Sequence, residues 1–193
     1  MDEQLRANPD DLVALMRAGR LSRERVAMAS YLGDERALAT GVKPWRPPRA
    51  RPEWVSPARF LMHHAALTHR QRVWLACLCC EHVLDTEESK LAAEAALSVT
   101  RRWCLGKADW HEVYRAHNPL DADSSVAFRL APTVIDAGLG PDSERLASPG
   151  SCAGAVKSAE GSRPIEEREA EQAWQAQAIA AVLLDPTWPP WDE

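Results

Sequence analysis

The sequence predicts an all-α protein, built as an irregular helical bundle or a helical-repeat-like stack of seven to nine helices. Alanine and leucine, which favour helices, account for 32 and 20 of the 193 residues, whereas Ile, Val, Thr, Phe and Tyr together contribute only 25. Apolar residues also recur at helical spacing between capping residues. From the length we expect one domain over residues 1–193. A chain of this length buries roughly 70% of its surface on folding, so it needs neither a metal nor a disulfide to fold.

Residues 1–40 are predicted to form a head of three short helices. The first begins at Asn8, a possible cap, and stops before Gly19. The second is capped by Ser22 and stops before Gly33, and the third follows directly.

Residues 41–57 form a proline-rich strap in our interpretation, because five prolines there remove backbone donors and favour extended geometry. Trp45 and Trp54 flank this segment and are expected to be buried, which favours a strap across the protein's own core. The alternative is that the basic segment docks in extended form on an aromatic groove of a partner.

Residues 58–139 are predicted to hold the core helices. They are expected at 60–67, 69–84, 86–105, 109–117 and 124–137. Thr68 caps the second of these, and its stretch from Val73 to Cys80 has no polar face, so we expect it to be central.

The rest of the chain divides into three predicted parts. Residues 140–163 are rich in Gly, Pro and Ser, which is typical of a flexible linker. Pro164 and the glutamates after it favour a final helix at 164–185. The Pro/Trp tail at 186–193 either docks on a partner or covers the end of its own bundle.

Two core helices carry a recognisable pattern. It consists of Trp74-Leu75-Ala76, Cys80-Glu81-His82-Val83-Leu84, Ala92 to Ala96, Arg102-Trp103 and Gly106. Over about residues 70–106 the chain thereby resembles the all-helical predicted immunity proteins of bacterial polymorphic-toxin systems, with weaker likeness at 21–34 and 171–175. The resemblance implies a non-enzymatic protein that acts by binding another protein, and it supplies no catalytic residue.

Cysteine and histidine residues gather around the central helix. Zinc prefers such ligands, but on a helix Cys77 and Cys80 share one face whereas Cys79 and His82 share another. Four ligands would not converge without help from His63, His69 or Cys104. We therefore predict buried, reduced thiols and neither metal nor cofactor.

No catalytic motif is present in the sequence. It contains no Gly-x-Ser-x-Gly elbow, no His-Glu-x-x-His pair and no phosphate-binding glycine loop after a strand. The apolar runs are shorter than the ~20 residues that a membrane span needs. We expect a cytoplasmic protein that is not an enzyme and does not enter a membrane.

Charge is unevenly distributed along the chain. Residues 17–72 contain twelve basic and four acidic side chains, a local net of +8 in a chain whose total is −5. This basic face either engages an acidic protein surface, contacts a nucleic-acid backbone, or neutralises the chain's own acidic C-terminal half.

The sequence thus predicts a protein-binding module that inhibits or scaffolds a partner with an acidic surface; the alternative is a nucleic-acid-binding regulator that uses residues 17–72. The expected contact residues are Arg46, Arg49, Arg51, Trp54 and Trp191.

Overall fold

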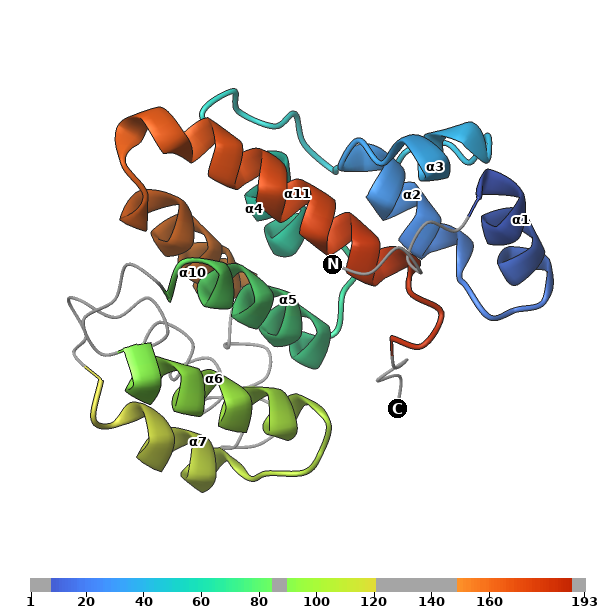
Figure 1. Cartoon of the computed structure of the whole chain (residues 1–193). Helices are drawn as coiled ribbons and strands as arrows, with labels where there is room; N and C mark the ends of the chain where they lie inside the picture. Colours follow the sequence, from blue (N-terminus) through green and yellow to red (C-terminus); the bar gives the residue numbers. More distant parts are fainter. Residues whose placement is uncertain (1–7, 85–89, 121–148, 189–193) are drawn as a thin grey trace.

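The computed structural model describes residues 8–84, 90–120 and 149–188, and within these ranges it is all-helical (Figure 1). The α-helices are α1 (Pro9–Arg17), α2 (Arg23–Tyr31), α3 (Glu35–Ala39), α4 (Pro57–His64), α5 (His69–His82), α6 (Lys90–Cys104), α7 (Trp110–His117), α10 (Pro149–Ser162) and α11 (Arg168–Leu184), and a short 3-10 helix, η4 (Ile165–Glu167), precedes α11. The described residues contain no strand, which confirms the predicted all-α architecture.

The helices pack in successive layers (Figure 1). α2 and α4 lie against α11, α10 packs on α4 and α5, and α6 lies between α5 and α7. α5 contacts α6, α10 and α11, so it is central as predicted. The core side chains of α5 that are fully buried are Val73, Leu75, Ala76, Cys77, Cys79 and Cys80.

Local capping signals set several helix starts. The hydroxyl of Ser22 accepts a hydrogen bond from the Arg25 backbone N–H at 3.2 Å. Thr68 caps α5 and Asp109 caps α7 in the same way, each within a capping box. α2 ends before Gly33, whose φ of 89° lies in the left-handed region that glycine adopts without strain.

The predicted linker at 140–163 is wrong over most of its length, because α10 occupies residues 149–162. Cys152, Ala155, Val156 and Ala159 are buried and follow the i, i+3, i+4, i+7 spacing of one helix face. These small side chains let α10 pack closely on α4 and α5. Gly154 lowers helix propensity by roughly 1 kcal/mol relative to Ala, a cost that this packing offsets.

Other predicted helix boundaries differ from those in the structure or lie outside the described residues. The helix predicted at 60–67 begins earlier as α4, because Ser56 accepts from the Arg59 N–H and Pro57 takes the first helical position. It ends at His64, since Ala65 is extended. The helix predicted at 124–137 and the first residues of the one at 86–105 lie outside the described residues.

Candidate interaction surface

The strap crosses the protein surface between α3 and α4 (Figure 1). Near its start, the Trp45 N–H donates to the Ala27 carbonyl of α2 at 2.8 Å, and the Trp45 ring meets the Tyr31 ring edge-on at 5.0 Å. Near its end, Val55 is buried. The strap is therefore held at both ends, while its middle is exposed.

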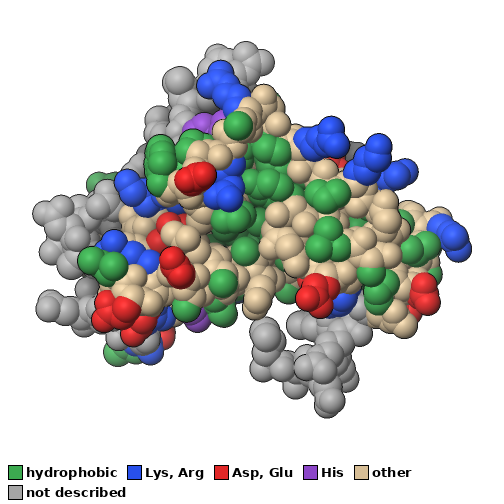
Figure 2. All heavy atoms as spheres, turned by 90° about the horizontal axis from the view of Figure 1, so that it is seen from above, with side chains coloured by type: hydrophobic (Ala, Val, Ile, Leu, Met, Phe, Trp, Pro, Cys, Tyr) green, Lys and Arg blue, Asp and Glu red, His purple; other side chains and the backbone are tan. Residues whose placement is uncertain are grey.

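Exposed cations occupy that middle. Arg46, Arg49 and Arg51 are all exposed, and Arg51 donates to the carbonyl of Val55. Among the described residues, no carboxylate forms an ion pair with Arg46 or Arg49. Figure 2 shows one face of the molecule from above, with hydrophobic side chains near its centre and both basic and acidic side chains around them. The two unpaired guanidinium groups are thus available to an anionic partner.

Trp54 is 76% exposed, which contradicts the expectation that both strap tryptophans are buried. The Val55 N–H donates to the Pro52 carbonyl at 3.0 Å, and this turn directs Val55 inward while Trp54 stays outside. The guanidinium of Arg59 lies 5.9 Å from the Trp54 ring centroid, within cation–π range. Tryptophan and arginine are both enriched among binding hot spots.

Two histidines, His63 and His64, lie at the end of α4. The His63 and His64 rings lie 4.5 Å apart, and His64 also packs against Phe60 at 4.4 Å. Burial lowers the pKa of His64, and the positive charges of His63 and Arg49 lower it further. We name Arg46, Arg49, Arg51, Trp54 and Arg59 the strap patch.

The predicted contact residue Trp191 lies outside the described residues. Its neighbour Trp188 is only 4% exposed, beneath the guanidinium of Arg25 at 5.1 Å. Arg25 also donates to the carbonyls of Leu183 at 2.8 Å and Asp185 at 2.5 Å. The described part of the tail therefore covers the protein's own bundle.

Some arginines of the basic face form contacts within the protein itself. Besides Arg25, Arg72 donates to the carbonyls of Met62 at 3.0 Å and Ala65 at 2.6 Å. Arg36 pairs with Asp34 at 2.8 Å. The strap is the segment of residues 17–72 that carries both exposed arginines and an exposed tryptophan.

All five cysteines are free and buried. Burial raises the pKa of Cys77, Cys79 and Cys104, and raises that of Cys152 to about 12. Within the described ranges, no three His, Cys, Asp or Glu side chains are placed to hold a metal ion. These thiols behave as small hydrophobic side chains rather than as nucleophiles.

A polar network, which the sequence analysis missed, lies between α5, α10 and α11. Glu171, 2% exposed, accepts from Gln175 Nε2 at 3.0 Å and pairs with His82 Nδ1 at 2.8 Å. Arg163 Nε lies 3.7 Å from the same carboxylate. The His82 ring stacks on Trp174 with centroids 3.5 Å apart. We name Glu160, Arg163, Glu171, Gln175 and His82 the interior network.

Glu160 brings the interior network to the edge of the strap patch. Its carboxylate accepts from Ser56 Oγ at 2.5 Å and from Gln172 Nε2 at 3.2 Å. Burial raises the pKa of Glu160, although these hydrogen bonds act in the opposite direction. Arg59 Nη1 lies 3.9 Å away, so one arginine side chain faces both Glu160 and the exposed Trp54.

The interior network contains a His–Glu pair, as many hydrolases do, but its setting favours a structural role. The neighbouring thiol, Cys79, is fully buried, and its pKa is raised by burial and then by Glu171 and Glu160. The carboxylates are occupied by side chains from other helices. No signal in the sequence pointed to this network, because His82 and Glu171 are 89 residues apart.

Comparison with family models, curated proteins and solved structures gives no match to this chain. The resemblance to immunity proteins therefore stays a prediction. Among the residues described, no helix has both the length and the apolar character needed to cross a bilayer.

Proposed function

We propose that this chain is a non-enzymatic protein-binding module that inhibits or scaffolds a partner protein through the strap patch. The observation that carries the proposal is the exposed indole of Trp54 on the same strap as Arg46 and Arg49, two exposed arginines without a carboxylate partner in the described structure. Arg and Trp are enriched among the residues that dominate binding energy. A partner with an acidic surface would supply the carboxylates.

The strap patch is also favourably organised for binding. Arg59 restrains the Trp54 ring before any partner arrives, and the buried Val55 fixes the backbone next to it. Restraint of this kind reduces the conformational entropy lost on binding. Planar guanidinium groups match carboxylates in two-point geometry, which gives orientation as well as attraction.

The test is a quantitative pull-down from the native host with three forms of the chain. One is wild type, one is Arg46→Glu/Arg49→Glu/Trp54→Ala, and the control is Arg20→Glu/Arg23→Glu, which reverses two exposed charges in the head. We expect wild type and control to recover the same stoichiometric partner. The strap-patch variant should lose at least about tenfold in recovery, since single hot-spot truncations cost ~2 kcal/mol or more. Recovery of the chain alone, or equal loss in both variants, would contradict the proposal.

The second candidate is a nucleic-acid-binding regulator that uses the basic face of residues 17–72. The exposed Trp54 ring favours it, because single-stranded bases stack on exposed aromatic side chains between cations. The overall charge of −5 opposes it. A mobility shift with a single-stranded oligonucleotide at low and moderate salt separates the two, because nucleic-acid affinity falls steeply with rising salt.

A further inference from the structure

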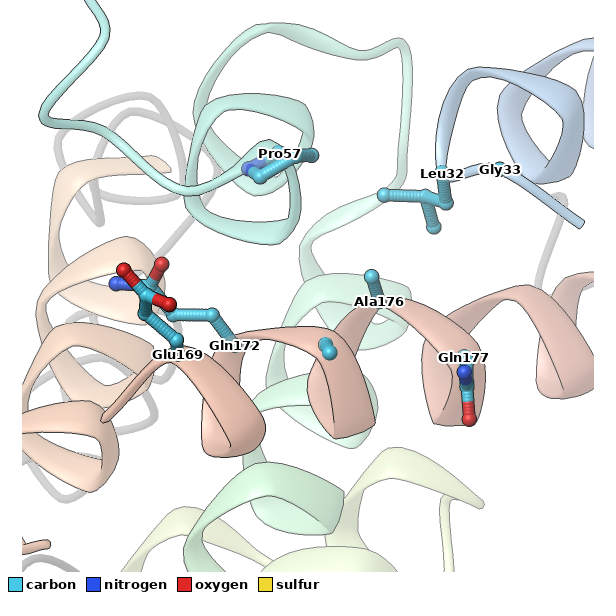
Figure 3. Close-up of a pocket in the computed structure, with 8 residues that line it drawn as sticks. Leu32, Gly33, Pro57, Glu169, Gln172, Ala176 and Gln177 are labelled. Atoms are coloured by element: carbon cyan, nitrogen blue, oxygen red, sulfur yellow. The ribbon is translucent and has the colours of Figure 1, made fainter. Parts of the chain in front are cut away.

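A groove at the end of the strap lies between α11, the start of α4 and the end of α2 (Figure 3). It encloses about 360 Å³ and is open to solvent. Leu32 and Ala176 point toward one another across it, and Pro57 lies to the left of Leu32 in Figure 3. Pro57 is the last residue of the strap. Gln172, which also lines the groove, donates at 3.2 Å to Glu160, and the Glu160 carboxylate lies 3.9 Å from Arg59 of the strap patch.

The lining of the groove differs chemically from the strap patch. Its apolar part is built from small or compact side chains: Leu32, Pro57, Ala173 and Ala176. Its polar edge includes Glu169 and Gln177, both exposed. A ligand lying across both regions would meet cations first, then a shallow apolar trough with one carboxylate at its edge.

We propose, resting on the proposed function, that the strap patch and this groove together bind one extended segment of the partner, with carboxylates at one end and small apolar side chains at the other. The carboxylates pair with Arg46 and Arg49, and the small side chains lie against Ala173 and Ala176. Charge complementarity favours such an acidic protein segment over a nucleic-acid strand. A nucleic-acid strand carries a phosphate at every step and would be repelled by Glu169 where it entered the groove.

The test is selection from a random dodecapeptide display library, which assumes no partner sequence. Four forms of the chain serve as bait: wild type, Ala173→Leu, Ala170→Leu and Arg46→Glu/Arg49→Glu. Ala173 lines the groove and is exposed, so leucine fills the trough without disturbing the core. Ala170 is exposed on the same helix and does not line the groove, so it controls for an added leucine.

We expect peptides selected on wild type and Ala170→Leu to be enriched in Asp and Glu at one end and in Ala, Val or Pro at the other. The best of them should bind Ala173→Leu about tenfold more weakly by fluorescence anisotropy. The Arg46→Glu/Arg49→Glu form should lose the acidic preference.

The remaining outcomes separate the two proposals. Acidic enrichment that depends on the arginines but is unaffected by Ala173→Leu would overturn the groove inference and leave the proposed function standing. Peptides without any acidic preference would overturn both. Tighter binding of a thymidine dodecamer than of the selected peptides would replace the acidic segment with a nucleic acid.

Discussion

The interior network and the strap patch differ in whether their charged side chains have partners of opposite charge. Inside, Glu171 faces His82, Arg163 and Gln175, side chains that come from three parts of the chain. On the strap, Arg46 and Arg49 have no carboxylate partner within the described residues. A buried charge is costly unless it is paired and hydrogen-bonded, whereas an exposed one is solvated by water. Fold stability and the proposed binding should therefore depend on largely different residues, with Arg59 shared between the two regions, and substitutions should separate them.

The largest expected effect comes from breaking the interior network. Glu171→Ala leaves Arg163, His82 and Gln175 without their shared acceptor, and removal of one partner from a buried pair typically costs ~3–5 kcal/mol. We expect a loss of about 3 kcal/mol in the free energy of unfolding, measured by urea denaturation with far-UV circular dichroism.

Glu169→Ala is the matched control, since Glu169 is exposed on the same helix. Its unfolding free energy should stay within about 0.5 kcal/mol of wild type. Equal effects of the two variants would mean that the interior network contributes no more to stability than a surface carboxylate does.

A second prediction concerns a buried histidine at the α6–α7 contact. His117 is 1% exposed, and its Nε2 lies 2.9 Å from Thr100 Oγ1. That hydroxyl donates to the Ala96 carbonyl at 2.8 Å, so Nε2 carries the proton and donates to the hydroxyl. Nδ1 has no hydrogen-bond partner among the described residues, which leaves the charged imidazolium unsupported.

Burial lowers the pKa of His117 from 6.5 to about 4. Because the folded pKa lies below the unfolded one, the unfolded chain binds more protons as pH falls from about 6.5 to about 4, and stability is lost over that window. The loss should reach about 3 kcal/mol. His117→Gln keeps a donor toward Thr100 but does not titrate, so its unfolding free energy should fall less over this window. Identical pH profiles would rule out His117 as the group responsible.

The smallest expected effect concerns the strap patch and the pKa of a histidine near it. Arg49→Gln removes one of the positive charges that lower the pKa of His64, so that pKa should rise. An NMR titration of the histidine ring protons measures the change. Arg36→Gln is the control, because Arg36 forms an ion pair with Asp34. An unchanged pKa of His64 in Arg49→Gln would show that the positive charge of Arg49 does not influence His64 on α4.

Features that depend on local sequence were predicted well. Helix starts at Ser22, Thr68 and Asp109 follow from the side chain at the cap and its near neighbours, so a local pattern suffices. α10 was missed because its Gly and Ser content is typical of a linker. Its buried face, with Cys152, Ala155, Val156 and Ala159, follows a helical spacing that could have revealed it.

The candidate site was predicted in part. Exposed arginines on the strap follow from composition, since proline-rich segments seldom bury charge. The exposure of Trp54 depends on a turn that sends Val55 inward instead, and one tryptophan cannot be told from another by hydrophobicity alone. The interior network joins residues far apart in the chain, so it needs the tertiary fold to be seen.

The hydrogen bonds of Arg25 to the last turn of α11 have a consequence for folding during synthesis. The carbonyls that Arg25 contacts belong to residues 182–185, which are synthesised more than 150 residues after Arg25 itself. The nascent head therefore emerges long before the surface on which α2 rests exists, and its docking must follow synthesis of α11. A product truncated before residue 168 would leave α2 without the α11 surface against which it packs, marking it for recognition by chaperones or proteases.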